Sequence, residues 1–159
     1  MTETEQRFYC QIGLISTGFA RLEHFIREII HLLIQTDDEF VSQLVIQENS
    51  ISQNQKLMVK LNRYRQTEEG KIDKLNKRID GLRINRNLFI HGEWNVYEEE
   101  GKEVVFVCST TRVTFKKVTY GTATFRNTHE AFRMIDLEKE VQQIHECVNL
   151  AREITKLLE

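Results

Sequence analysis

Residues 82–94 read LRINRNLFIHGEW. The stretch mixes apolar and polar side chains, and Gly92 follows directly after His91. Its polar members are Arg83, Asn85, Arg86, Asn87 and His91. Arg86 lies at helical spacing from a series of apolar residues, so Arg86 and these apolar residues share one helix face. That series is Leu75, Ile79, Leu82 and Phe89. Because a guanidinium stays charged, this face is expected to open onto a cleft, an ion pair or a partner.

Helices are predicted on the N-terminal side of this stretch. Apolar residues recur every three or four positions from residue 5 to about 35, which predicts one long helix. Within it, Gly13 and Gly18 either weaken the helix slightly or let another helix approach closely. A short helix is expected after capping residues at 36–38 and through Ile46, and another from Ser50 or Ser52 to about Arg65. Residues 66–70 are expected to form a polar turn.

The helix that carries residues 82–91, called the motif helix below, is predicted from about residue 71 to His91, with Gly92 as a left-handed C-terminal cap. The pattern then alternates apolar and polar residues, which predicts three or four short antiparallel strands up to about Arg126. Asp136 is expected to cap a last helix. The fold class is therefore mainly α, a helical bundle with a small antiparallel sheet or hairpin insertion before the last helix. One domain is expected to span residues 1–159.

Composition is typical of a soluble globular protein, with 40% hydrophobic and 29% charged residues among 159. No apolar run reaches the length of a membrane span, and the N-terminus is polar and acidic, unlike a secretory signal. Cys10, Cys108 and Cys147 are odd in number and form no CxxC pair, which favours reduced thiols over disulfides or a zinc site. We therefore expect a cytoplasmic protein that does not contact membranes.

Positive charge is concentrated in residues 52–92, where ten lysines and arginines face four acids. This segment carries a net charge of +6. Because the whole chain has a net charge of −2, the rest of the chain carries −8. Such a segment matches the footprint of a protein that binds a phosphate backbone, and it also matches an ordinary solvated helix face. The candidate RNA-binding residues are Lys74, Lys77, Arg78 and Arg83.

His24, Glu28 and His31 lie at i, i+4 and i+7 of the first predicted helix, a spacing that could hold a metal ion. Polar helix stripes commonly give the same spacing. We expect neither a metal nor another cofactor.

Arg86, four intervening residues and then His91, with Asn87 directly after the arginine, resemble the signature of HEPN-domain ribonucleases. Those domains are small bundles of about four helices, with the motif near the end of an inner helix and a closing helix behind it. The predicted helix order is similar, although residues 94–134 depart from the minimal bundle as a β-rich insertion. The resemblance implies a metal-independent endoribonuclease whose site forms at a homodimer interface. Family members often act as toxins or in phage defence, so it also implies RNA and an antitoxin or other protein as partners.

The chemistry of the motif can be argued from its residues. RNA is cleaved without a metal when its own 2′-hydroxyl attacks the adjacent phosphorus. His91 suits the proton transfer that this step needs, because an imidazole titrates near neutral pH. Arg86 suits the charge that gathers on the phosphoryl oxygens. Asn87 lies one turn before His91 and could orient its ring. These three residues are the candidate catalytic set.

Helix geometry also favours a dimer. Arg86 and His91 lie about 140° apart around one helix, so a single helix would straddle one phosphate poorly. The motif helix is apolar on two sides, one with Leu82 and Phe89 and the other with Ile84 and Leu88. Assembly as a homodimer through this helix would cover the second apolar side and would let two motif helices share one phosphate.

Each motif residue also has a purely structural interpretation. His91 followed by Gly92 is typical of an ordinary helix C-terminus. Arg86 could pair with Glu23 or Glu28 of the first helix, and Asn87 could cap a neighbouring backbone. The rival function is a non-catalytic HEPN-like module that binds a protein or a nucleotide.

Overall fold

The computed structural model describes residues 1–35, 39–67, 69–115 and 123–159. The elements in these residues are α1 (Glu3–Ile34), α2 (Glu39–Gln47), α3 (Ile51–Arg65), α4 (Glu69–His91), β1 (Glu93–Tyr97), β2 (Val105–Phe115), β3 (Ala123–Phe132) and α5 (Met134–Leu158). The predicted class, mainly α with a small antiparallel sheet before the last helix, is confirmed. None of the described helices combines the length and the apolar character needed to cross a bilayer.

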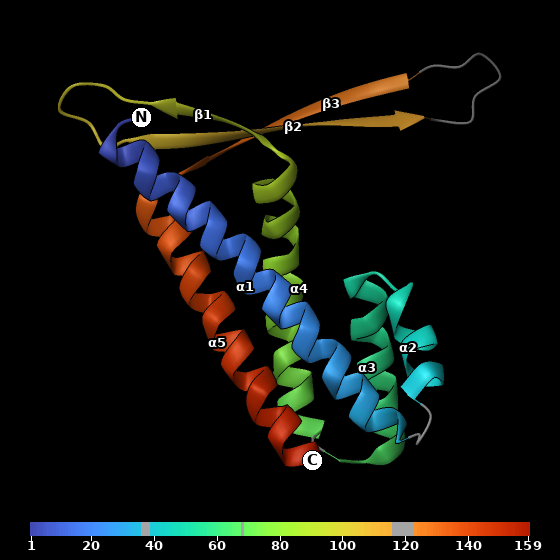
Figure 1. The fold of residues 1–159 in the computed structure, drawn as a ribbon. Coiled ribbons are helices and arrows are strands. Elements are labelled where there is room, and N and C mark those ends of the chain that lie inside the picture. Colours follow the sequence, from blue (N-terminus) through green and yellow to red (C-terminus); the bar gives the residue numbers. More distant parts are fainter. Residues whose placement is uncertain (36–38, 68, 116–122) are drawn as a thin grey trace.

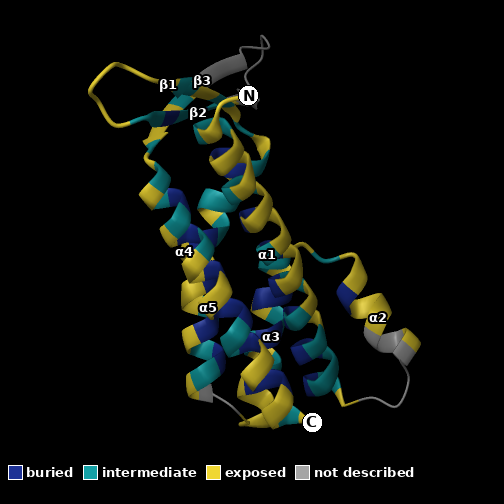
Figure 2. Ribbon diagram, turned by 60° about the vertical axis from the view of Figure 1, so that its left-hand side comes forward, coloured by how far each residue is buried: buried dark blue, intermediate teal, exposed yellow. Residues whose placement is uncertain are grey.

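The bundle is built around α1 and α5, which lie side by side and run in the same direction (Figure 1). The motif helix α4 runs the opposite way against both, and α3 packs on α1 and α4. Buried residues line the inner faces of these helices, whereas exposed residues cover the outer faces (Figure 2). Gly18 lets α5 come close, since a Cβ there would stand 2.7 Å from Cγ2 of Ile144. The predicted close approach of a second helix is thus confirmed at Gly18, while a Cβ at Gly13 would meet nothing within 4 Å.

The sheet has the order β1-β2-β3, and both pairs of strands are antiparallel. Its strands are longer than expected. The segments predicted at 104–108 and 113–115 belong, from Val105 onward, to the single strand β2, and the last strand ends at Phe132 rather than near Arg126. Continuous pairing from Phe106 opposite Phe132 to Phe115 opposite Ala123 explains the difference, because each added pair extends the ladder through polar Thr and Asn residues.

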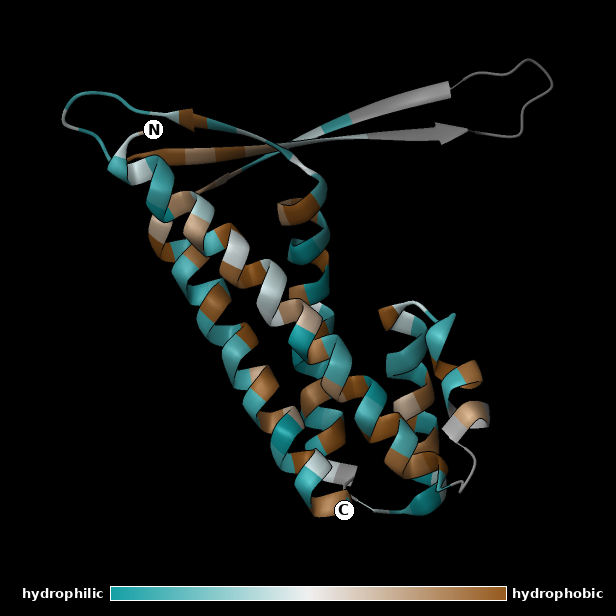
Figure 3. Cartoon of the chain, in the orientation of Figure 1, coloured by the Kyte–Doolittle hydropathy of each residue, from teal (hydrophilic) through white to brown (hydrophobic). Residues whose placement is uncertain are grey.

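An aromatic cluster joins the sheet to the helices. The ring of Phe8 on α1 stacks on Phe106 with centroids 4.6 Å apart, and it meets Trp94 edge-on at 5.1 Å. Phe89 on α4 lies 5.7 Å from Trp94 and 5.0 Å from Phe132. The indole N–H of Trp94 donates to the carbonyl of Phe89 at 3.1 Å. The hydrophobic part of the sheet accordingly lies over the end of the bundle (Figure 3).

Two predicted helix ends are wrong in detail. Gly92 is not left-handed: it is needed because a Cβ there would stand 2.1 Å from Sγ of Cys108 and 2.6 Å from the Leu88 carbonyl oxygen. Asp136 does not precede α5 but lies in its first turn, where a carboxylate oxygen accepts the backbone N–H of Arg133 at 3.0 Å. Ser50, rather than Ser52, caps α3. The capping residues predicted at 36–38 lie outside the described residues.

Candidate functional site

The last turns of α4 hold the three predicted catalytic residues. Figure 1 shows that α3 reaches only part of the way along α4, so these turns continue past it to the sheet. Leu82 and Phe89 of α4 are buried in the core, which fixes the rotation of the helix. That rotation decides which way each polar side chain points.

Arg86 points toward α1, where its Nη2 lies 3.9 Å from Oε1 of Glu23. Nη1 donates to Oδ1 of Asn87 at 3.1 Å. The side chain remains 30% exposed, and its buried Nε has no partner among the described residues. Of the two ion-pair partners considered for Arg86, Glu23 is therefore the one in contact, whereas Glu28 pairs with His24 at 3.1 Å.

His91 is the last residue of α4 and is exposed to solvent. Its ring makes no hydrogen bond within the described part of the chain. The carboxamide of Asn87 contacts Arg86 instead of His91, so the expected orienting contact is absent there and Asn87 positions the guanidinium. Arg86 and His91 thus point to different sides of α4, as their spacing predicts.

An apolar stripe accompanies His91 on the outer face of α4. Ile84 is 69% exposed and Leu88 is half-buried, and both share this face with His91 at i, i+4 and i+7. Of the two apolar sides predicted for α4, one is therefore covered by the bundle and the other faces outward.

The predicted RNA-binding residues do not form one patch. Lys74, Lys77 and Arg78 are exposed on α4, and Arg78 donates to Glu146 of α5 at 3.3 Å. Arg83 lies on the opposite side, in a groove between α3 and α4. A helix distributes successive side chains around its axis, so a basic run in sequence was a poor guide to a basic surface.

Sequence reasoning missed a part-buried polar pair behind the motif. Asn85 donates through Nδ2 to Oε2 of Glu140 on α5 at 3.1 Å, while the buried Oε1 of Glu140 has no partner among the described residues. Burial raises the pKa of the Glu140 carboxyl, and the hydrogen bond from Asn85 opposes this in part. The sequence did indicate that Glu140 would be buried, because it lies at i+3 from Leu137 and i−4 from Ile144 in the apolar stripe of α5.

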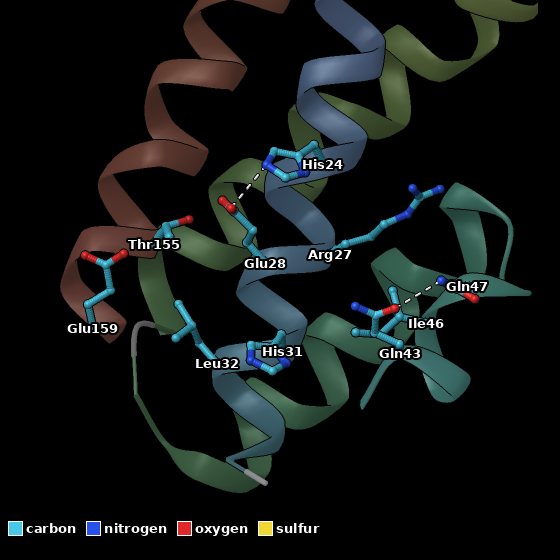
Figure 4. Close-up of a pocket in the computed structure, with 10 residues that line it drawn as sticks. All are labelled: His24, Arg27, Glu28, His31, Leu32, Gln43, Ile46, Gln47, Thr155 and Glu159. Atoms are coloured by element: carbon cyan, nitrogen blue, oxygen red, sulfur yellow. Dashed lines mark hydrogen bonds and ion pairs between the residues drawn. The ribbon is translucent and has the colours of Figure 1, made fainter. Parts of the chain in front are cut away.

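The His24, Glu28 and His31 series lines a separate cavity of about 440 Å³ between α1, α2 and α5. His24 turns toward Glu28, and His31 lies further along α1 (Figure 4). Among the described residues, no three His, Cys, Asp or Glu side chains are grouped closely enough to hold one metal ion.

Comparison of the chain with known protein families, curated proteins and solved structures found no match.

Proposed function

We propose that this protein is a metal-independent endoribonuclease of the HEPN kind that works as a homodimer in the cytoplasm. The observation that carries the proposal is the presence of an exposed His91 and a partly exposed Arg86 in the last turns of α4, beyond the reach of α3. An imidazole and a guanidinium are the two groups that the chemistry requires.

In the proposed reaction the 2′-oxygen of a ribose attacks the adjacent phosphorus. The new P–O2′ bond forms as the P–O5′ bond breaks, which leaves a 2′,3′-cyclic phosphate and a 5′-hydroxyl. His91 takes the proton from the 2′-hydroxyl. Arg86 donates hydrogen bonds to the phosphoryl oxygens, where negative charge gathers in the transition state. The leaving oxygen receives its proton from the His91 of the second copy.

Glu23 and Asn87 prepare Arg86 for this role. A guanidinium without contacts would sample many orientations. The contacts of Arg86 with Glu23 at 3.9 Å and with Asn87 at 3.1 Å restrict its orientation. The same two contacts are what a structural arginine would make, and they favour the rival function, a non-catalytic module that binds a protein or nucleotide. The two proposals differ in whether RNA is cut.

The outward stripe of Ile84 and Leu88 supports the dimer. Ile84, which is 69% exposed, and the half-buried Leu88 form an apolar stripe beside the polar motif, and a second α4 helix packed on that stripe would remove it from water. Contact of two α4 helices through this stripe would bring two His91 rings to one interface. A role as a toxin or in phage defence, with an antitoxin or other protein as partner, follows from the family resemblance and is part of the proposal.

The test is incubation of purified protein with RNA in EDTA, followed by analysis of the product ends. We expect cleavage with 2′,3′-cyclic phosphate ends, lost in His91→Ala and kept in His145→Ala, a matched exposed histidine on α5. Intact RNA, or cleavage that survives His91→Ala, would reject the proposal. Binding of protein or nucleotide partners without cleavage would support the rival.

A further inference from the structure

A second polar surface lies between α3 and α4, away from the face that carries His91. It is a groove of about 510 Å³ lined by Ser52, Gln55, Lys56, Val59, Lys60, Arg63, Asn76, Asp80 and Arg83. Four of these residues are cations and one is an acid, which leaves a local charge of +3. None of the four cations makes an ion pair within the described residues, so the positive charge of the groove is not neutralised there.

The cations follow a line. Lys56, Lys60 and Arg63 lie at i, i+4 and i+7 of α3, a stripe about 10 Å long. Arg83 faces them from α4. A stripe of this length matches successive phosphates of a strand better than one small anion.

An exposed aromatic ring lies beside the stripe. Tyr64 lies four residues after Lys60 and is 80% exposed. The guanidinium of Arg65 stands 5.7 Å from the centre of its ring, and the same Arg65 donates to the carbonyls of Leu33 and Ile34 at 3.1 and 3.0 Å. Arg65 is thus anchored to α1 and lies over the Tyr64 ring, while most of the tyrosine surface remains exposed for stacking.

The floor of the groove is polar. Gln55 is only 2% exposed, and its Nε2 donates to Asn76 at 3.2 Å and to Asp80 at 3.3 Å. Its Oε1 and the Nε of Arg83 are buried without a partner in the described residues. Buried polar atoms that lack partners are costly, so this floor does not suit an apolar ligand.

We propose that this groove binds single-stranded nucleic acid, with its phosphates on Lys56, Lys60, Arg63 and Arg83 and a base stacked on Tyr64. A positive groove that follows the backbone, combined with an aromatic platform, is the usual arrangement for single strands. An acidic protein segment would use the charges but not the ring. Identifying the strand as an RNA substrate rests on the proposed function. Because Arg83 precedes Arg86 by one turn, a strand in the groove would lead toward that site.

The experiment measures fluorescence anisotropy of a labelled single-stranded 12-mer of 2′-O-methyl RNA, which cannot be cleaved because it lacks the attacking hydroxyl. Lys56→Gln/Lys60→Gln removes two charges from the groove, and Lys139→Gln/Lys156→Gln removes two exposed charges from α5 as the matched control. Tyr64→Ala is compared with Tyr97→Ala, an exposed tyrosine on β1. Thermal melting checks that every variant is folded.

The groove variant should bind roughly tenfold more weakly at 0.15 M salt, and its log–log salt slope should fall by about 1.4, since each single-strand phosphate contact contributes about 0.7. Tyr64→Ala should weaken binding by about 5- to 150-fold. Both controls should bind like the wild type. Asp80→Asn, which removes the one carboxylate of the groove, should tighten binding.

Three results would overturn the proposal: no binding at low salt, equal losses in groove and control variants, or competition by polyglutamate as effective as that by unlabelled strand. These results are independent of cleavage. A protein that binds through the groove but leaves RNA intact keeps this inference and loses the proposed function. A protein that cuts RNA yet ignores the groove substitutions does the reverse.

Discussion

Gly13 and Gly18 lie in the same long helix and give a matched test of how closely α1 and α5 pack. Replacing glycine by alanine in a helix interior gains about 1 kcal/mol from propensity alone. At Gly13 nothing lies within 4 Å of the new Cβ, so that gain should be realised in full. At Gly18 the new Cβ would stand 2.7 Å from Cγ2 of Ile144, which must move. Overpacking of this kind costs about 1–3 kcal/mol.

Only the first of the two variants should therefore stabilise the protein. Gly13→Ala should raise the melting temperature by about 2–4 °C, and Gly18→Ala should leave it unchanged or lower it by up to about 8 °C. Ile144→Leu removes the offending Cγ2 at nearly constant volume, so it should cost less in the Gly18→Ala background than alone. Differential scanning calorimetry of the four-protein cycle measures this coupling. If Gly18→Ala stabilises as much as Gly13→Ala, the close packing of the two helices is refuted.

Four further predictions concern the site and its surroundings. His91→Ala should lower RNA cleavage by about 10²- to 10⁴-fold with little change in RNA affinity, whereas Arg86→Ala should reduce both, as single-turnover kinetics and anisotropy can show. Ile84→Lys should turn the proposed dimer into a monomer in equilibrium sedimentation; a wild-type monomer at tens of micromolar contradicts the proposed dimer itself. Gly92→Ala should lower the melting temperature, because a Cβ would collide with Cys108 and the Leu88 carbonyl. The raised pKa of Glu140 means that the folded protein holds this proton more tightly than the unfolded chain, so stability falls as pH rises through the interval between the two pKa values. Glu140→Gln should therefore melt higher than wild type at pH 7, and the gap should close below about pH 4; a gap that persists in acid would assign the gain to something other than charge.

Regular helices were predicted well because their signals are local. The 3.6-residue period located α1, α3, α4 and α5 to within a few residues, and Ser50 acts as the cap that its side chain suggested. The sheet was predicted less well. Strand length is set by pairing with a partner strand, and the run of polar residues from Ser109 to Arg112 carries no alternation that would reveal it.

The candidate site was predicted only as far as one helix can specify it. Spacing alone places Arg86 and His91 on different sides of α4. It could not reveal that Glu23 rather than Glu28 meets Arg86, since this depends on how α1 and α4 are aligned. Nor could a basic run in one segment show that Arg83 joins Lys56 and Lys60 of another helix, because that surface exists only once α3 and α4 pack.

Trp94, the one tryptophan in the sequence, sits where the helical bundle meets the sheet. Its indole N–H is bonded to a carbonyl of the last turn of α4, two residues before His91. The tryptophan fluorescence of this protein therefore reports on a single junction rather than on an average over the molecule. Excitation at long ultraviolet wavelengths would follow separation of the sheet from the bundle without any label. A change in emission would equally record any event that shifts the end of α4.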